Sequence, residues 1–265
     1  MYFFDQKSSK IYLEEGVNQQ VNAGKPFYFL AICRFETGLN TLFYIVTEKK
    51  VFEINCGEKT QKELFANSKV NYFKAFKGMG SIVFQGKLCL IGGFNKSSER
   101  NERSFQLCPI NLPQWTQGVP LNIGRSSPAV CSMDDSLYIC GGWGSSLLSS
   151  IEKYKNHIWV CLSFRISPSN SCSMVPISGA RVLIFGQVNN EPHCVQEVNF
   201  CRKSVKKHKN LPIANISNYN FLFNNRTLIA FDLQKTVQRV EMKKSDWPDL
   251  ESFLLIREKL YLKLI

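Results

Sequence analysis

The side chains with chemistry to offer in this chain are ten cysteines, three histidines and one run of basic residues. The cysteines are Cys33, Cys56, Cys89, Cys108, Cys131, Cys140, Cys161, Cys172, Cys194 and Cys201. No two of them form a C-x-x-C pair, and only His193 stands next to a cysteine, Cys194. A zinc site needs clustered ligands. We therefore expect buried free thiols in a reducing compartment, with no metal site and no cofactor.

Catalytic motifs are missing from the sequence. It contains no G-x-S-x-G elbow, no H-E-x-x-H pair and no phosphate-binding loop. The paired carboxylates Asp134 and Asp135 stand where a hairpin turn is expected, and there they serve turn geometry. The sequence therefore nominates no catalytic residue, and we expect a protein that is not an enzyme.

The formal net charge is +12, and part of it is concentrated in one segment. Its basic residues are Arg202, Lys203, Lys206, Lys207 and Lys209. Lysines on an exposed strand edge discourage pairing with other strands, which is one interpretation of the segment. A patch for an acidic partner protein is the second. Nucleic acid is the third and weakest, because no nucleic-acid module or interleaved stacking aromatics accompany the charges.

A short apolar strand, here called the anchor strand, recurs along the chain and must position these residues. Its two clearest copies, residues 88–93 and 137–142, end in a pair of glycines. Weaker copies are residues 1–5, 41–47, 181–187 and 226–232. Successive copies lie about 42 to 49 residues apart, which is the period of four-stranded propeller blades. Six copies fit the length of 265 residues.

Each unit continues from its anchor strand in the same order: an alternating strand, a weaker third strand and a fourth apolar run. We expect one all-β domain, residues 1–265, of four-stranded antiparallel blades. The approximate units are residues 1–40, 41–86, 87–135, 136–180, 181–225 and 226–265. A short helix within residues 58–69 is the one exception that the composition allows. Residues 249–265 repeat the strand pattern, and we expect strands there too.

The two central units resemble the kelch repeat. Gly92-Gly93, Trp115 and Arg125 stand at family-like positions in one unit. Gly141-Gly142, Tyr154 and Trp159 do so in the next. The resemblance implies a β-propeller of six blades, with five to seven compatible with the weaker outer units. It also implies that the anchor strands run near the central channel, where glycine permits close approach. Residues 1–5 and 260–265 compete for one place at ring closure.

The resemblance further implies a protein-interaction module that presents loops on one face of the ring to a protein partner. The expected surface combines the loops after the anchor strands with those between the second and third strands. The candidate partner-binding residues are Asn95, Arg100, Arg103, Trp143, Ser145, Asn189, Asn190 and Glu191. Such residues supply hydrogen bonds, charge or an aromatic anchor. The partner's identity stays open, with an acidic or cytoskeletal protein as the expected kind.

Two alternatives remain. Kelch domains often follow a dimerisation or zinc-finger domain, so the chain can be the substrate-recognition part of a larger cytoskeletal or ubiquitin-ligase adaptor. Copper-dependent sugar oxidases also contain kelch-type blades, but three scattered histidines fit a copper site poorly. No run is long enough to span a membrane, and residues 1–5 are too short and too soon charged for a secretory signal. We expect a cytoplasmic location, with the nucleus as the alternative.

Overall fold

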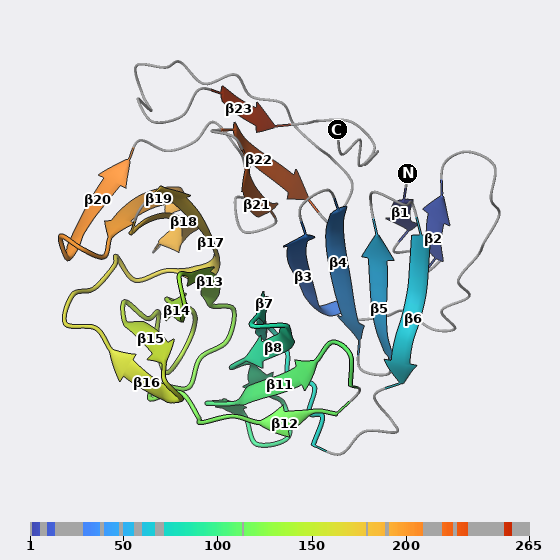
Figure 1. Ribbon diagram of the computed structural model, residues 1–265. Coiled ribbons are helices and arrows are strands. Elements are labelled where there is room, and N and C mark those ends of the chain that lie inside the picture. Colours follow the sequence, from blue (N-terminus) through green and yellow to red (C-terminus); the bar gives the residue numbers. More distant parts are fainter. Residues whose placement is uncertain are drawn as a thin grey trace.

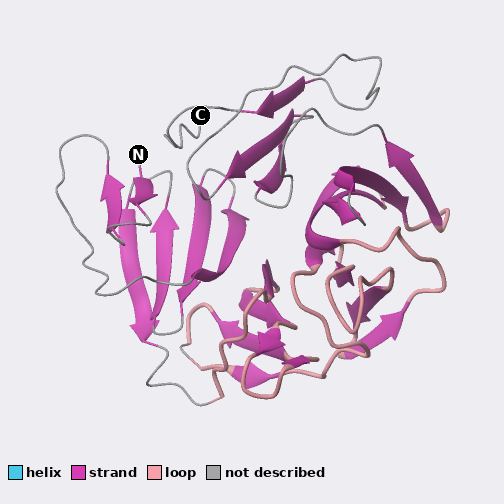
Figure 2. Ribbon diagram, turned by 180° about the vertical axis from the view of Figure 1, so that it is seen from behind, coloured by secondary structure: helices cyan, strands magenta, loops and turns pink. Residues whose placement is uncertain are grey.

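The computed structural model describes most of the chain, and the account below concerns these residues. They are residues 2–5, 10–13, 29–37, 40–47, 50–55, 60–66, 72–112, 114–178, 180–188, 191–208, 219–224, 227–232 and 252–255. All regular structure within these ranges is β-strand and none is helix (Figure 2). The expected all-β class is confirmed.

Four sheets have four antiparallel strands each, as predicted for propeller blades. The first sheet contains β3 (Phe29–Thr37), β4 (Asn40–Thr47), β5 (Lys50–Asn55) and β6 (Thr60–Ala66). The second contains β7 (Gly80–Phe84), β8 (Lys87–Ile91), β11 (Phe105–Pro109) and β12 (Thr116–Gln117). The third sheet contains β13 (Ala129–Met133), β14 (Ser136–Cys140), β15 (Ile151–Lys155) and β16 (Ile158–Cys161). The fourth contains β17 (Asn170–Ser178), β18 (Arg181–Val188), β19 (Glu191–Asn199) and β20 (Ser204–His208). Each pairs neighbours in sequence, so short hairpins join most strands.

The sheets follow one another around a common centre (Figure 1). Their first strands lie side by side: β3 contacts β7, β7 contacts β13, and β13 contacts β17. The anchor strands β4, β8, β14 and β18 are the second strands of their sheets. The anchor strands therefore lie one strand away from the place nearest the centre. The apolar run before each anchor occupies that place, because it pairs with the anchor and begins the sheet.

The proposed short helix within residues 58–69 is also wrong. Residues 60–66 form β6, which pairs along its length with β5 and is the outer strand of the first sheet. The ladder to β5 supplies backbone hydrogen bonds that a helix would otherwise make internally. Tertiary pairing has overridden a local composition that suited either structure.

The chain ends are described only in part. β1 (Tyr2–Asp5) pairs with β2 (Lys10–Leu13), as the sequence suggested. β21 (Tyr219–Asn224) pairs with β22 (Thr227–Asp232), but β23 (Ser252–Leu255) pairs with β22 in parallel. That sheet departs from the antiparallel pattern of the others. The expected strand at residues 260–265 lies outside the described residues, as do residues 233–251, so the count of six blades, ring closure and the unit boundaries stay predictions.

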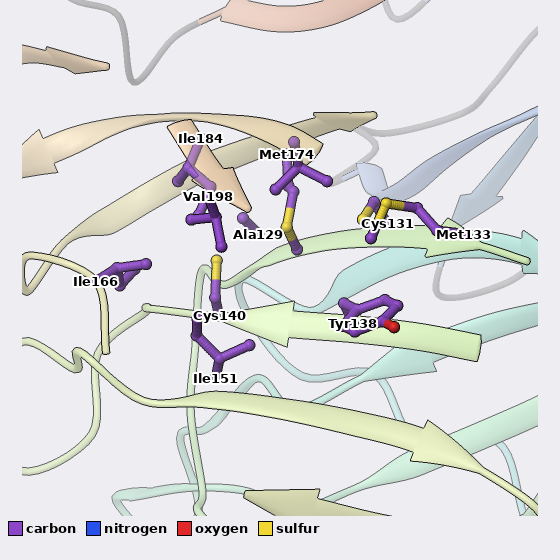
Figure 3. Packing of buried hydrophobic residues seen from close by; sticks show 11 residues of the cluster. Ala129, Cys131, Met133, Tyr138, Cys140, Ile151, Ile166, Met174, Ile184 and Val198 are labelled. Carbon is purple, nitrogen blue, oxygen red and sulfur yellow. The ribbon is translucent and has the colours of Figure 1, made fainter. Parts of the chain in front are cut away.

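The core lies between neighbouring sheets. Figure 3 shows one cluster, in which Ala129 and Cys140 of one sheet meet Met174, Ile184 and Val198 of the next. The preceding interface stacks aromatic rings, with Phe105 edge-on to both Tyr154 and Trp159 at centroid distances of 5.0 and 5.4 Å. Trp115 is fully buried and Trp159 is 7% exposed. The repeat aromatics thus fill space between sheets, where they remove large apolar areas from water.

Candidate interaction surface

Two loops follow the glycine pairs and leave neighbouring sheets at the same end. Gly92, Gly93, Gly141 and Gly142 all have positive φ, between 60° and 101°. A Cβ on Gly92 would overlap the carbonyl oxygen of Arg125, and one on Gly142 would lie 2.6 Å from the carbonyl oxygen of Ser126. Glycine is required here because the next segment of chain packs directly on the backbone.

The first loop, residues 94–104 (the Asn95 loop), folds into a small hairpin of β9 (Phe94–Asn95) and β10 (Arg100–Asn101). Asn95 Oδ1 accepts the backbone N–H of Ser97 at 3.0 Å. Its Nδ2 donates to Glu102 Oε1 at 2.8 Å. Asn95 therefore maintains the shape of the loop.

Two arginines are among the outward-facing residues of this loop, together with Lys96 and Glu99. Arg100 and Arg103 are both exposed. Arg103 donates from Nε to the carbonyl oxygen of Leu121, which fixes its stem against the next segment. Asn101 Nδ2 donates to the carbonyl oxygen of Gly144 at 2.8 Å, and this bond links the Asn95 loop to the second loop.

The second loop, residues 143–150 (the Trp143 loop), carries the exposed tryptophan. The Trp143 side chain is 46% exposed, although its backbone exchanges two hydrogen bonds with Ser126, at 2.8 and 2.9 Å. Leu148 N–H donates to the carbonyl oxygen of Gly142 at 2.9 Å and closes the loop on itself. Ser145 is exposed at its tip. The structure thus presents an aromatic ring to solvent from a backbone held at several points.

Arg125 joins the two loops. Its backbone carbonyl accepts from Gly93 N–H at 2.7 Å, and its N–H donates to the carbonyl oxygen of Glu102 at 3.1 Å. Its side chain reaches the other loop: Nη1 donates to the carbonyl oxygens of Gly141 at 2.8 Å and Ser150 at 3.3 Å. Arg125 therefore makes hydrogen bonds at or near both ends of each loop.

Glu152 neutralises Arg125. Arg125 Nη2 lies 2.7 Å from Glu152 Oε1, and both side chains are fully buried. Glu152 also accepts the backbone N–H groups of Asn122 and Ile123, at 2.7 and 3.2 Å. The repeat alignment identified Arg125 but missed its partner.

A signal for Glu152 was present in the sequence. Gln106 and Gln196 occupy the equivalent position in the neighbouring sheets, and each is buried directly after a buried apolar residue, as Glu152 is. Each glutamine side chain makes two hydrogen bonds to the backbone of one residue in the preceding segment: its oxygen accepts the N–H and its nitrogen donates to the carbonyl oxygen. That residue is Lys74 for Gln106 and Ser167 for Gln196. A polar residue that recurs at a buried repeat position indicates a recurring link between blades.

The remaining predicted loop residues are not all brought to this surface. Asn189 and Asn190 lie outside the described residues. Glu191 is the first residue of β19 and pairs with Val188, so its placement in a loop was wrong. The ladder between β18 and β19 extends as far as the pair Val188–Glu191.

The loops between the alternating strand and the weaker strand after it, which in this sheet are β15 and β16, do not share this end of the sheets. β15 runs antiparallel to both β14 and β16, so the Trp143 loop lies at one end of β15 and the turn Asn156–His157 at the other. The expectation that both kinds of loop form one surface was wrong. Successive connections in an antiparallel sheet necessarily alternate between its two ends.

The basic segment lies elsewhere, on the outer edge of the β17–β20 sheet. Lys206 and Lys207 are exposed on β20, the outer strand, as the sequence suggested. Arg202 and Lys203 are exposed in the turn before it, and Lys209 lies outside the described residues. His208 Nε2 lies 2.9 Å from Glu197 Oε2.

The described residues offer little to a metal or a nucleophilic reaction. No group of three or more His, Cys, Asp or Glu side chains gathers among them. Burial raises the pKa of the Cys131 thiol, and it raises that of Cys108 to about 11. Burial also raises the pKa of Cys161, with a further contribution from the Glu152 charge. Within the same residues, no helix has the length and apolar character needed to cross a membrane.

Comparison with known proteins points to one family. Residues 124–163, which contain Arg125, the Trp143 loop and Glu152, match the Kelch motif. The chain is 32% identical over 96 residues to Kelch repeat and BTB domain-containing protein 1 of cowpox virus (strain Brighton Red). It is 40% identical over 67 residues to Kelch-like ECH-associated protein 1A of Danio rerio.

These matches are partial on both sides. They cover 35% and 24% of this chain, and the chain spans only 17% and 11% of the two relatives. The matched motif coincides with the part of the fold in which glycine pair, tryptophans and buried arginine are arranged as the repeat implied. In the neighbouring sheet of β7, β8, β11 and β12, strand β8 is likewise followed by a glycine pair, Gly92-Gly93, and a tryptophan, Trp115, is buried. The chain therefore contains a kelch motif and is similar to kelch-repeat proteins.

Proposed function

We propose that the chain is a non-catalytic protein-interaction module that binds a protein partner through the Asn95 and Trp143 loops. The observation that carries the proposal is Trp143, which is 46% exposed on a loop fixed at both ends by buried Arg125. Exposed tryptophans and arginines are the residues most often found at the energetic centres of interfaces. A loop already held in one conformation loses little entropy on binding.

Neighbouring groups support the same surface. Arg100 and Arg103 add positive charge from the adjoining Asn95 loop, and Ser145 adds a hydroxyl group. These groups favour a partner with carboxylates around an apolar or aromatic contact. An acidic or cytoskeletal protein is therefore the kind of partner that we propose.

The names of the relatives suggest a wider context. Several are kelch repeat and BTB domain-containing proteins of poxviruses, and this chain spans only a small part of them. We propose as a second possibility that the chain acts as the substrate-recognition part of an adaptor.

Cytoplasmic location is part of the proposal, and it is supported by six free cysteines among the described residues.

The test is affinity capture with the 265-residue chain, followed by mass spectrometry at low and moderate salt. A Trp143→Ala variant is compared with Tyr72→Ala, which removes another exposed aromatic side chain, 71% exposed, outside both loops. We expect a stoichiometric partner that the wild type and Tyr72→Ala retain and Trp143→Ala loses. Retention by all three proteins would reject the loop surface. Recovery of nucleic acid alone, released as salt rises, would reject a protein partner.

A further inference from the structure

The outer strand of the β13–β16 sheet exposes two aliphatic side chains on one face. Ile158 is 56% exposed and Val160 is 48% exposed, whereas Trp159 between them points to the opposite face and is 7% exposed. Single exposed hydrophobic residues are common on protein surfaces. Two at alternate positions of one strand form a continuous strip, because residues i and i+2 share a face.

The other sheets show that this strip is not a requirement of the fold. The register of each outer strand identifies the residues equivalent to Ile158 and Val160. They are Thr60 and Lys62 in the first sheet, Gln114 and Thr116 in the second, and Ser204 and Lys206 in the fourth; all are exposed. The six equivalent positions in the other three described four-stranded sheets are therefore polar, and the sheet that carries Trp143 differs from them in being apolar there. Polar residues evidently suffice to build an outer strand.

Two lysines of the neighbouring strand β15 lie beside the strip. Lys153 is opposite Val160 and Lys155 is opposite Ile158 across the β15–β16 ladder, so all four side chains share one face. Lys153 Nζ lies 5.4 Å from the centroid of the Tyr138 ring, and that ring lies 4.3 Å from the ring of Phe200 in the next sheet. The contact between Tyr138 and Phe200 covers the part of this face nearest the centre of the molecule. Ile158 and Val160 lie on the outer strand and are exposed to solvent.

We propose that this face, composed of Lys153, Lys155, Ile158 and Val160 (the β16 face), binds an acidic segment of a partner protein. The segment would place aliphatic side chains on Ile158 and Val160 and carboxylates beside the two lysines. Charge complementarity selects this occupant. A second copy of the chain would bring the same lysines and a net charge of +12 against its own.

The contact is made by side chains and not by adding a strand to the sheet. The carbonyl oxygen of Trp159 already accepts a hydrogen bond from Asn122 Nδ2 at 3.0 Å. Leu162 N–H donates to the carbonyl oxygen of Ile151 at 2.9 Å. Because hydrogen-bonded pairs alternate along an antiparallel ladder, Val160 and Ile158 face β15, and the polar backbone groups of Trp159 face the free edge. An incoming strand would have to displace Asn122.

The β16 face is distinct from the proposed Trp143 surface. Ile158 follows the turn Asn156–His157, at the end of β15 opposite to the Trp143 loop. One partner can therefore occupy the loops while another segment occupies the β16 face. Loss of Trp143 is expected to leave the β16 face unchanged, so the two proposals can fail separately.

The experiment measures fluorescence anisotropy of short labelled peptides with the full chain. The probe alternates Leu or Val with Glu; one comparison peptide replaces Glu by Lys and another replaces Leu and Val by Ser. We expect the wild type to bind the first peptide at least about tenfold more tightly than either of the others. The variant Ile158→Ser/Val160→Thr, which installs residue types found at the equivalent positions, is expected to lose about tenfold in affinity. Lys153→Ser/Lys155→Ser is expected to weaken binding and flatten its salt dependence.

Controls separate this result from general attraction to a basic protein. Lys206→Ser/Lys207→Ser removes two charges from the β20 edge and is expected to leave the affinity within about twofold. The Ile158→Ser/Val160→Thr variant must retain the wild-type midpoint of thermal unfolding. Equal peptide binding by that variant and the wild type would overturn the proposal, as would loss of binding only in the β20 variant. Concentration-dependent dimerisation in sedimentation, abolished by Ile158→Ser/Val160→Thr, would replace the acidic partner by a second copy.

Discussion

Arg125 Nη2 and Glu152 Oε1 lie 2.7 Å apart, and neither side chain reaches solvent. A buried ion pair stabilises a fold only if its remaining hydrogen-bonding groups are also satisfied. Here the backbone meets most of that need: Glu152 accepts from Asn122 and Ile123, and Arg125 donates to Gly141 and Ser150. The pair therefore fixes the relative position of three chain segments that underlie the two candidate binding loops.

Breaking this pair is the first prediction. Arg125→Met is expected to lower the free energy of unfolding by about 3–5 kcal/mol, because it leaves the Glu152 carboxylate buried without its cation. The double variant Arg125→Met/Glu152→Gln removes both charges and installs the residue type found at positions 106 and 196. It is expected to recover part of the loss. Urea unfolding measures both, and a double variant less stable than Arg125→Met would contradict the explanation.

The second prediction separates backbone strain from close packing in the glycines. Gly86 and Gly92 have nearly the same φ, 70° and 69°, but a Cβ on Gly86 meets no atom within 4 Å. Gly86→Ala is expected to cost only the strain of a left-handed residue, about 1–2 kcal/mol. Gly92→Ala adds an overlap with the carbonyl oxygen of Arg125, so its cost in chemical denaturation is expected to be clearly larger. Equal losses of stability for Gly86→Ala and Gly92→Ala would show that the carbonyl oxygen of Arg125 leaves room for a Cβ at Gly92.

Trp143 and Trp159 provide the third prediction. Trp159 is 7% exposed, packs against Phe105 and donates from its indole to the carbonyl oxygen of Val119 at 3.0 Å. Trp159→Ala is expected to lower the free energy of unfolding by about 3–5 kcal/mol. Trp143→Ala is expected to change it by less than about 1 kcal/mol, because the ring is 46% exposed. A large loss of stability for Trp143→Ala would mean that the ring serves the fold.

How much of this was predictable from the sequence depends on the range of the interaction. Strand positions followed from the repeat, because period-two alternation and glycine turns are local signals: Gln85 and Gly86, with φ of 49° and 70°, make the hairpin turn expected there. The place of each strand within its sheet did not follow. A circular repeat has no marked beginning, so the sequence did not reveal that sheets start one strand before the anchor.

The candidate site was predictable in its residues and less so in its geometry. Trp143 was identified because it follows a glycine pair into a loop. Asn95 was chosen for its hydrogen-bonding groups, yet the structure uses those groups within the loop. The Arg125–Glu152 pair joins residues 27 positions apart, and no local pattern specifies which buried charges meet. The recurring polar residue at positions 106, 152 and 196 indicates a link between blades, but the atoms that it contacts depend on how the blades stack.

The fourth prediction concerns alkaline pH. Burial raises the pKa of the Cys108 thiol from 9.0 to about 11, and it raises that of Cys131 as well. Because the folded protein binds these protons more tightly than the unfolded chain, the thiols contribute their full stability below pH 9. That contribution is lost as the pH rises from about 9 towards 11.

Urea unfolding at a series of pH values measures this effect. Cys108→Ala/Cys131→Ala is expected to be somewhat less stable than the wild type at neutral pH, owing to lost packing. Its stability should then fall less steeply than that of the wild type above pH 9, because fewer buried thiols can ionise on unfolding. Cys201→Ala is the control for the removal of a thiol as such, since that residue is exposed. Parallel curves for all three proteins would show that the buried thiols do not govern alkaline stability.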